Sequence, residues 1–226
     1  DHIESLTFEA TKEHVYAAAM TSLAGKLHTK MQSTISECAV EAAEAITMTS
    51  NGSIVADPTR VKVIARSGPS LEQSKLITGL ALPKKRAHVE MPSTLGAGSI
   101  LLVDGGLELR SLSTDVQLNV TSTSVLQSFR DAEQQRLLEQ VKMLKKLDIT
   151  LLACREGIDD SMHAHLAEAG IKAFRRVAKS DLELLARGCG ARLVPTIHQA
   201  KDADVGVFIS SRCERWGDVD HWILET

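Results

Sequence analysis

Cysteine and histidine are the residues of this chain best suited to direct chemistry. The 226 residues include 4 cysteines and 8 histidines. The possible zinc ligands are Cys154, His163, His165, Cys189 and His198, but no pair of them has the short spacing usual in zinc sites. The cysteines also lack the C-x-x-C spacing. We therefore expect neither a metal site nor a disulfide framework.

Phosphate chemistry needs a glycine loop that presents backbone N–H groups to the ligand. The segments LGAGS, DGGLE and GCGAR pair glycines, but none has the spacing of a P-loop or of a dinucleotide-binding loop. Asp159 and Asp160 form an acid pair at a predicted helix start, where carboxylates favourably meet the helix dipole. We expect no catalytic residue and no bound cofactor. A small free-standing α/β enzyme is therefore the least favoured function for this chain.

The composition is that of a globular protein. Apolar residues make up 43% of the chain and charged residues 24%, and the net charge is -3. Such a chain has no excess of positive charge that could bind a polyanion, so we expect no nucleic-acid partner. No apolar run is long enough to cross a bilayer and the first residues do not resemble a signal peptide. We expect no membrane partner and a cytoplasmic location.

Helical periodicity in the first part of the chain predicts two helices between residues 11 and 46, separated near Gly25. A turn-rich segment, TSNGSIVADP, follows and predicts a domain boundary that divides the chain into 1–58 and 59–226. After it, short β-type runs predict a sheet-rich block, with strands at 60–65, 75–82, 88–92, 99–109 and 115–120.

Strands and helices alternate in the second half of the chain. Predicted strands at 149–154, 171–177 and 191–197 are separated by predicted helices at 157–170 and 179–190. This order is typical of βαβ units with a parallel sheet, so the fold class is α/β. The tail reads as a hairpin that turns at Gly217 and Asp218.

The helix predicted at 121–147 is apolar at both ends and polar between them. Its C-terminal half carries Leu137, Val141 and Leu144 at helical spacing, whereas 130–136, RDAEQQR, offers only one alanine to a core. We expect a helix that leaves the domain, with an exposed apolar tip that binds a partner. The tip residues are Val125, Leu126 and Phe129. Alternatively, the tip folds back onto the predicted strand at 116–120.

The helix predicted at 157–170 has one buried face. At about 100° per residue, Ile158, Met162, His165 and Ala169 share that face. His163 falls on the opposite side, so we expect it to be exposed and His165 to lie at the edge of the core.

Several motifs together resemble the central part of a group II chaperonin subunit, the family of the archaeal thermosome and the eukaryotic cytosolic chaperonin. They are TSLAGK at 21–26, SGPSLEQSKLITGLAL at 67–82, ILLVDGGLEL at 100–109, GIDD at 157–160 and AGIKAFRRVAKSDLELLARGCGA at 169–191. The resemblance runs nearly end to end. It implies helices of an intermediate domain at 1–58, followed at 59–226 by a β/α-sandwich apical domain whose protruding helix serves as a built-in lid.

The resemblance also implies partners: non-native polypeptides, and other subunits in a double ring. Clients would contact the helix at 157–170, and the tip of the protrusion would contact neighbouring lids or clients. The client-binding residues would be Asp160, His163, Ala164, Ala167 and Glu168. Ser161, Ala164 and His165 replace residues that are usual in the family, which marks a divergent member.

The phosphate loop and catalytic aspartate of the family's ATPase do not occur in this sequence. The resemblance therefore implies a truncated subunit, with ATP and Mg²⁺ bound in an equatorial domain outside it. An interaction domain like that of large phosphoinositide kinases, which is similar in fold, is the alternative.

Overall fold

The computed structural model describes residues 11–50, 53–67, 70–107 and 123–226, without the side chains at 49–50, 53–54, 123–131 and 133. Backbone contacts divide the chain into two units, Asp1–Thr78 and Gly79–Thr226. This division lies after the boundary predicted at 58, because the following segment packs on the second helix: Lys30 Nζ lies 2.7 Å from Glu72 Oε2. The assignment of 1–58 and 59–226 as functional domains stays a prediction.

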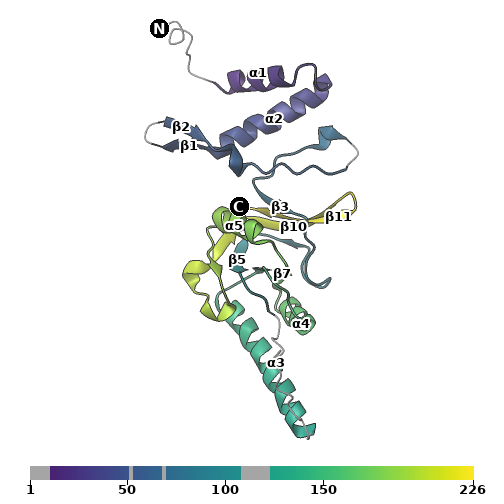
Figure 1. Cartoon of the computed structure of the whole chain (residues 1–226), viewed down its shortest axis with the longest axis vertical. Helices are drawn as coiled ribbons and strands as arrows, with labels where there is room; N and C mark the ends of the chain where they lie inside the picture. Colours follow the sequence, from purple (N-terminus) through teal and green to yellow (C-terminus); the bar gives the residue numbers. More distant parts are fainter. Residues whose placement is uncertain (1–10, 51–52, 68–69, 108–122) are drawn as a thin grey trace. The chain divides into compact units, whose positions relative to one another are not determined.

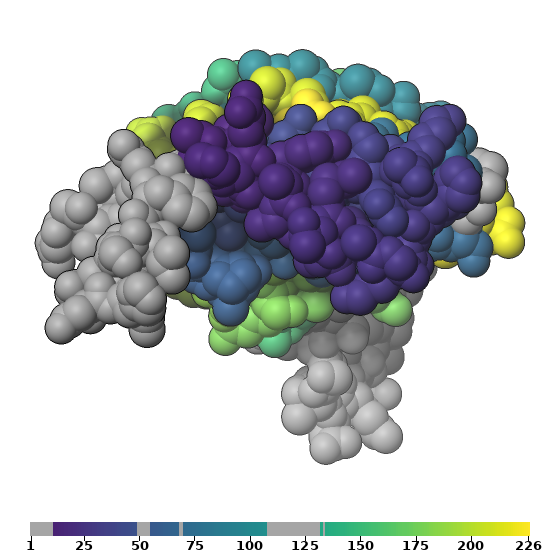
Figure 2. All heavy atoms as spheres, turned by 90° about the horizontal axis from the view of Figure 1, so that it is seen from above, coloured from purple at the N-terminus to yellow at the C-terminus, as the bar shows by residue number. Residues whose placement is uncertain are grey.

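The first unit contains the two predicted helices, α1 (Lys12–Leu23) and α2 (Thr29–Ile46), so that prediction is confirmed. A hairpin of β1 (Thr47–Ser50) and β2 (Ser53–Ala56) and two 3₁₀ turns, η2 (Pro58–Arg60) and η3 (Leu71–Gln73), follow. The strand predicted at 60–65 is wrong. Val63 is 88% exposed, because no layer covers this segment to bury alternate side chains. No residue of α1 is buried, and Figure 2 shows its outer surface in purple.

A five-stranded sheet forms the centre of the second unit. Its strands are β5 (Gly98–Val103), β6 (Leu151–Cys154), β7 (Lys172–Phe174), β8 (Leu193–Val194) and β9 (Gly206–Phe208). The order β7-β6-β5-β8 is parallel throughout, which confirms the predicted α/β class, and β9 pairs antiparallel with the first half of β5.

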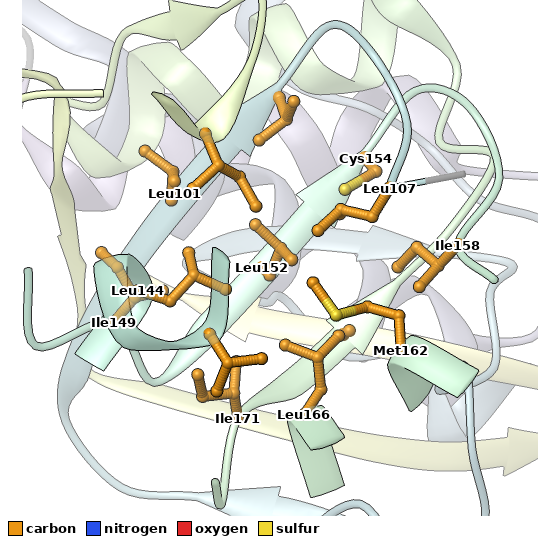
Figure 3. Packing of buried hydrophobic residues seen from close by; sticks show 14 of the residues in the cluster. Leu101, Leu107, Leu144, Ile149, Leu152, Cys154, Ile158, Met162, Leu166 and Ile171 are labelled. Atoms are coloured by element: carbon orange, nitrogen blue, oxygen red, sulfur yellow. The ribbon is translucent and has the colours of Figure 1, made fainter. Parts of the chain in front are cut away.

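Both faces of this sheet are buried, which explains why its strands are continuous apolar runs. Leu101 and Leu152 point into one cluster, while their neighbours Ile100 and Leu151 point into another on the opposite face. Figure 3 shows the first cluster, to which the helices α3 (Thr123–Lys146) and α4 (Asp160–Glu168) contribute.

A four-stranded antiparallel sheet and α5 (Lys179–Cys189) cover the second cluster. The sheet consists of β3 (Gly79–Leu82), β11 (Val219–Glu225), β10 (Ser210–Trp216) and β4 (Thr94–Leu95), in that order. The hairpin β10–β11 turns at Gly217 and Asp218, as predicted. Trp222 stacks on Phe174 with ring centroids 3.9 Å apart, and this contact joins the two sheets.

Helices α3, α4 and α5 complete the described part of the second unit (Figure 1). The longest, α3, occupies most of the predicted 121–147, and α4 and α5 follow β6 and β7 as the alternating pattern indicates. Gly190 ends α5 in the left-handed conformation, with φ of 68°. Two short 3₁₀ turns, η4 (Ile197–Gln199) and η5 (Asp202–Asp204), lead to β9. The strand predicted at 115–120 lies outside the described residues.

Candidate functional site

Helix α4 is a short helix with a firmly packed inner side. It begins after the N-cap residue Asp159 and ends at Ala169 and Gly170, whose φ is 72°. Met162 and Leu166 are completely buried and extend into the cluster that also holds Leu144 and Ile158 (Figure 3). The position of α4 is therefore set by apolar packing against the sheet and α3.

The outer side of α4 carries most of the residues predicted to bind clients. Asp160, Ala164 and Glu168 are exposed, and Ala167 is half-buried. Two carboxylates thus flank a small apolar centre. Such a surface offers both polar and apolar contacts to a partner and has no large hydrophobic side chain of its own.

His163 contradicts the prediction that it is exposed, because only 3% of its surface is accessible. The prediction used Ile158 and Ala169 to orient the buried face, but both residues lie outside the regular helix. Within the helix the buried residues are Met162, His163 and Leu166, so the buried stripe is turned toward His163. His165, predicted at the core edge, has 23% of its side chain accessible, with Nδ1 3.9 Å from Glu168 Oε2.

The ring of His163 has different surroundings on its two sides. Nδ1 lies 3.4 Å from Oδ1 of the exposed Asp160, whereas Nε2 is buried and has no hydrogen-bond partner among the described residues. Burial, followed by the nearby Arg175, lowers the pKa of His163, while Asp160 and Asp159 act in the opposite direction. The neutral ring is therefore the favoured form in this position.

A loop between β3 and β4 lies beside α4. The ring centroid of His88 is 6.2 Å from that of His163. Ala87 N–H donates a 2.8 Å hydrogen bond to the Ala173 carbonyl of β7, and Met91 is buried in the cluster beneath α4. The strand predicted at 88–92 is wrong because this segment turns to bury Met91. Val89 points outward and is 74% exposed.

Helix α3 is attached through its C-terminal half only, as far as its described side chains show. Leu137, Val141 and Leu144 are buried, as predicted. In the polar segment before them the described residues Ala132, Gln134, Gln135 and Arg136 are exposed. The side chains of the predicted tip, Val125, Leu126 and Phe129, lie outside the described residues, so neither an exposed tip nor a folded-back tip is established.

A groove at the carboxyl ends of β5, β6 and β8 was missed by the sequence analysis. It has a volume of about 630 Å³. It lies between the loops that follow these strands and the C-terminal half of α3. Arg155 bridges its rim, with Nε 2.7 Å from Asp104 Oδ1 and a terminal nitrogen 3.2 Å from Glu156. The available signal was the order of the parallel strands, because grooves form where the chain crosses from one side of a sheet to the other.

The described part of the chain contains no group of three or more histidine, cysteine or acidic residues arranged to hold a metal ion. Among its helices, none combines the length and apolar character that a membrane crossing needs.

A comparison with models of protein families shows the family to which the chain belongs. The model of the TCP-1/cpn60 chaperonin family matches residues 1–225. The chain belongs to this family. Relatives of this chaperonin chain include a thermosome subunit of Methanopyrus kandleri, 32% identical over 195 residues, and the thermosome subunit beta of Archaeoglobus fulgidus, 33% identical over 188 residues. These alignments cover 86% and 83% of the chain, but 36% and 34% of the relatives.

The chaperonin chain thus spans about a third of the length of these relatives. Its fold is similar to that of an open-state monomer of a group II chaperonin from Methanococcoides burtonii, with a TM-score of 0.74 and 23% identity. That match covers 99% of the chain and 50% of the solved chain.

Proposed function

We propose that this chain is the polypeptide-binding and lid-forming part of a group II chaperonin subunit, and that the exposed side of α4 holds non-native polypeptides. The observation that carries the proposal is the exposed surface formed by Asp160, Ala164 and Glu168 of α4. Its mixed character suits segments of many sequences, each held weakly, and several copies in a ring would add avidity.

Helix α3 supplies the lid in this proposal. Its buried residues near the C-terminal end fix the base, and its polar middle suits a rod surrounded by solvent. Val125, Leu126 and Phe129 would then contact neighbouring lids or a client. ATP and Mg²⁺ would be bound outside this chain, and other subunits would complete a ring. The relatives found are thermosome subunits, which gives no support to the phosphoinositide-kinase alternative.

A capture assay tests the lid. We expect the double variant Leu126→Ser/Phe129→Ser to capture a labelled, permanently unfolded polypeptide at least threefold more weakly than the parent chain. The matched control is Leu138→Ser, because Leu138 is a 40% exposed residue in the anchored half of the same helix. Equal capture by the parent chain and the double variant would remove the tip from the mechanism.

A further inference from the structure

His163 is unusual among the buried residues of α4 because it is ionisable. Met162 and Leu166 beside it are apolar, and 3% exposure gives His163 almost no contact with water. A neutral imidazole with its proton on Nδ1 carries that proton on the nitrogen 3.4 Å from Asp160 Oδ1 and leaves only a lone pair unpaired on Nε2. A protonated imidazole would place both a charge and an N–H group in the interior, with no acceptor among the described residues.

The charged groups around this ring come from several elements. Helix α4 contributes Asp160 and its N-cap residue contributes a second carboxylate, Asp159. The end of β7 is followed by Arg175, and the loop contributes His88. The His88 ring in turn lies 3.8 Å from a carboxylate oxygen of Glu90.

Helix α3 and strand β7 pack on α4 from the core side. The residues that they place in the shared cluster are apolar and cannot titrate: Leu137, Val141, Leu144 and Ala173.

We propose that His163 is a pH-sensitive latch: its neutral ring keeps α4 seated beside the His88 loop, and protonation loosens α4 and uncovers Met162 and Leu166. This inference rests on the proposed function, since it gives the polypeptide-binding side of α4 a means of regulation. Acid would change that side from a mixed surface with small apolar residues into one with large apolar residues, which bind unfolded segments more tightly.

Proton linkage gives the direction in which pH shifts the balance between the seated and the loosened state of α4. In the seated state the pKa of His163 is lowered, chiefly by burial, while in the loosened state the ring titrates near its ordinary value of about 6.5. The loosened state therefore binds more protons between these two values, and the seated state is fully favoured only above pH 6.5. Each unit of pH below that value shifts the balance toward the loosened state by up to about tenfold, until the lower pKa is reached.

Hydrogen exchange of the 226-residue chain without client tests the latch, with rates corrected for the intrinsic effect of pH. We expect protection of α4 and of residues 84–92 to fall, by up to about tenfold, between pH 7.5 and pH 5.5, while α5 on the other face of the sheet stays protected. His163→Gln removes this fall. His165→Gln keeps it, because His165 already contacts solvent. Unchanged protection of α4 in the parent chain, or an undiminished fall in His163→Gln, would overturn the proposal.

Two surface variants keep the test decisive if His163→Gln does not fold. Arg175→Gln removes a positive charge near His163, raises the seated pKa and should reduce the fall in protection. Asp160→Asn removes a negative charge and should enlarge it. The same direction of change in both variants would contradict the latch.

Client capture separates the latch from the proposed function. At pH 7.5 the latch is closed, so capture there depends on the proposed function alone. If the chain captures client at pH 7.5 but acid does not loosen α4, the latch is contradicted and the proposed function is supported. If acid loosens α4 but the chain captures no client at either pH, the latch is supported and the proposed function is contradicted.

Discussion

The Nζ atom of Lys172 donates a 2.8 Å hydrogen bond to the backbone carbonyl of Ser93, although the Lys172 side chain is completely buried. The same nitrogen lies 3.2 Å from Ser211 Oγ and 3.3 Å from the Ser211 carbonyl. Burial lowers the pKa of Lys172. One side chain of the parallel sheet therefore satisfies polar groups of strand β10 and of the segment before β4, and ties the two sheets together.

Replacing this lysine should be costly. We expect Lys172→Met to lower the free energy of unfolding by about 2 kcal/mol, because it removes the hydrogen bonds that a charged donor makes to Ser93 and Ser211. Urea denaturation measures the difference, with Lys85→Met as an exposed control that should stay within about 0.5 kcal/mol of the parent. A variant as stable as the control would show that these hydrogen bonds contribute nothing net.

The anchor of α3 gives a second prediction. Leu144 is fully buried between α3 and the sheet, whereas Leu138 on the same helix is 40% exposed. Leu144→Ala should lower the free energy of unfolding by about 2–5 kcal/mol, through lost burial and the cavity it leaves. Leu138→Ala should cost less than about 1 kcal/mol. Equal costs in denaturant titrations would mean that the base of α3 is not fixed by this packing.

Gly206 marks a close approach between β9 and the end of α5. A Cβ at this position would lie 2.7 Å from the Ala191 Cβ and 2.7 Å from the Cys189 carbonyl oxygen. Gly206→Ala should therefore destabilise the chain by about 1–3 kcal/mol. Gly96→Ala is the matched control, since nothing lies within 4 Å of a Cβ there. Thermal unfolding of both variants should show a lower midpoint for Gly206→Ala alone.

Thiol labelling should divide the cysteines into two pairs. Cys38 and Cys213 are half-buried, whereas Cys154 and Cys189 are buried. Burial raises the pKa of both buried thiols, that of Cys189 to about 11, so little reactive thiolate forms at neutral pH. In the native chain a thiol reagent at pH 8 should modify Cys38 and Cys213 first. Rapid modification of Cys154 without denaturant would contradict the packing of β6.

Much of the fold could be predicted because its patterns are long and local. The alternation of apolar strands and glycine-ended helices after residue 149 predicted the parallel sheet, and the polar middle of α3 predicted an exposed segment above a buried base. The short runs at 60–65 and 88–92 have β-type composition but form no strands. Composition says which side chains suit a strand, but pairing depends on a neighbour that is distant in sequence.

The candidate site was harder to predict than the fold. A helix of nine residues has few positions to define its buried face, so a small error in its bounds placed His163 on the wrong side. The contact between His163 and His88 joins two segments far apart in the sequence, and no local pattern reports it. The groove beside Asp104 likewise arises from three strand ends that come together only in the folded sheet.

Photocrosslinking tests the central claim most directly. A benzophenone amino acid is placed at Ala164, on the exposed side of α4, and in a matched chain at Glu183, exposed on α5 across the sheet. With a labelled unfolded polypeptide at pH 7.5, we predict a crosslink yield at position 164 at least fivefold above that at 183. Equal yields at the two positions, or no crosslink at 164, would contradict the assignment of α4 as the polypeptide-binding element.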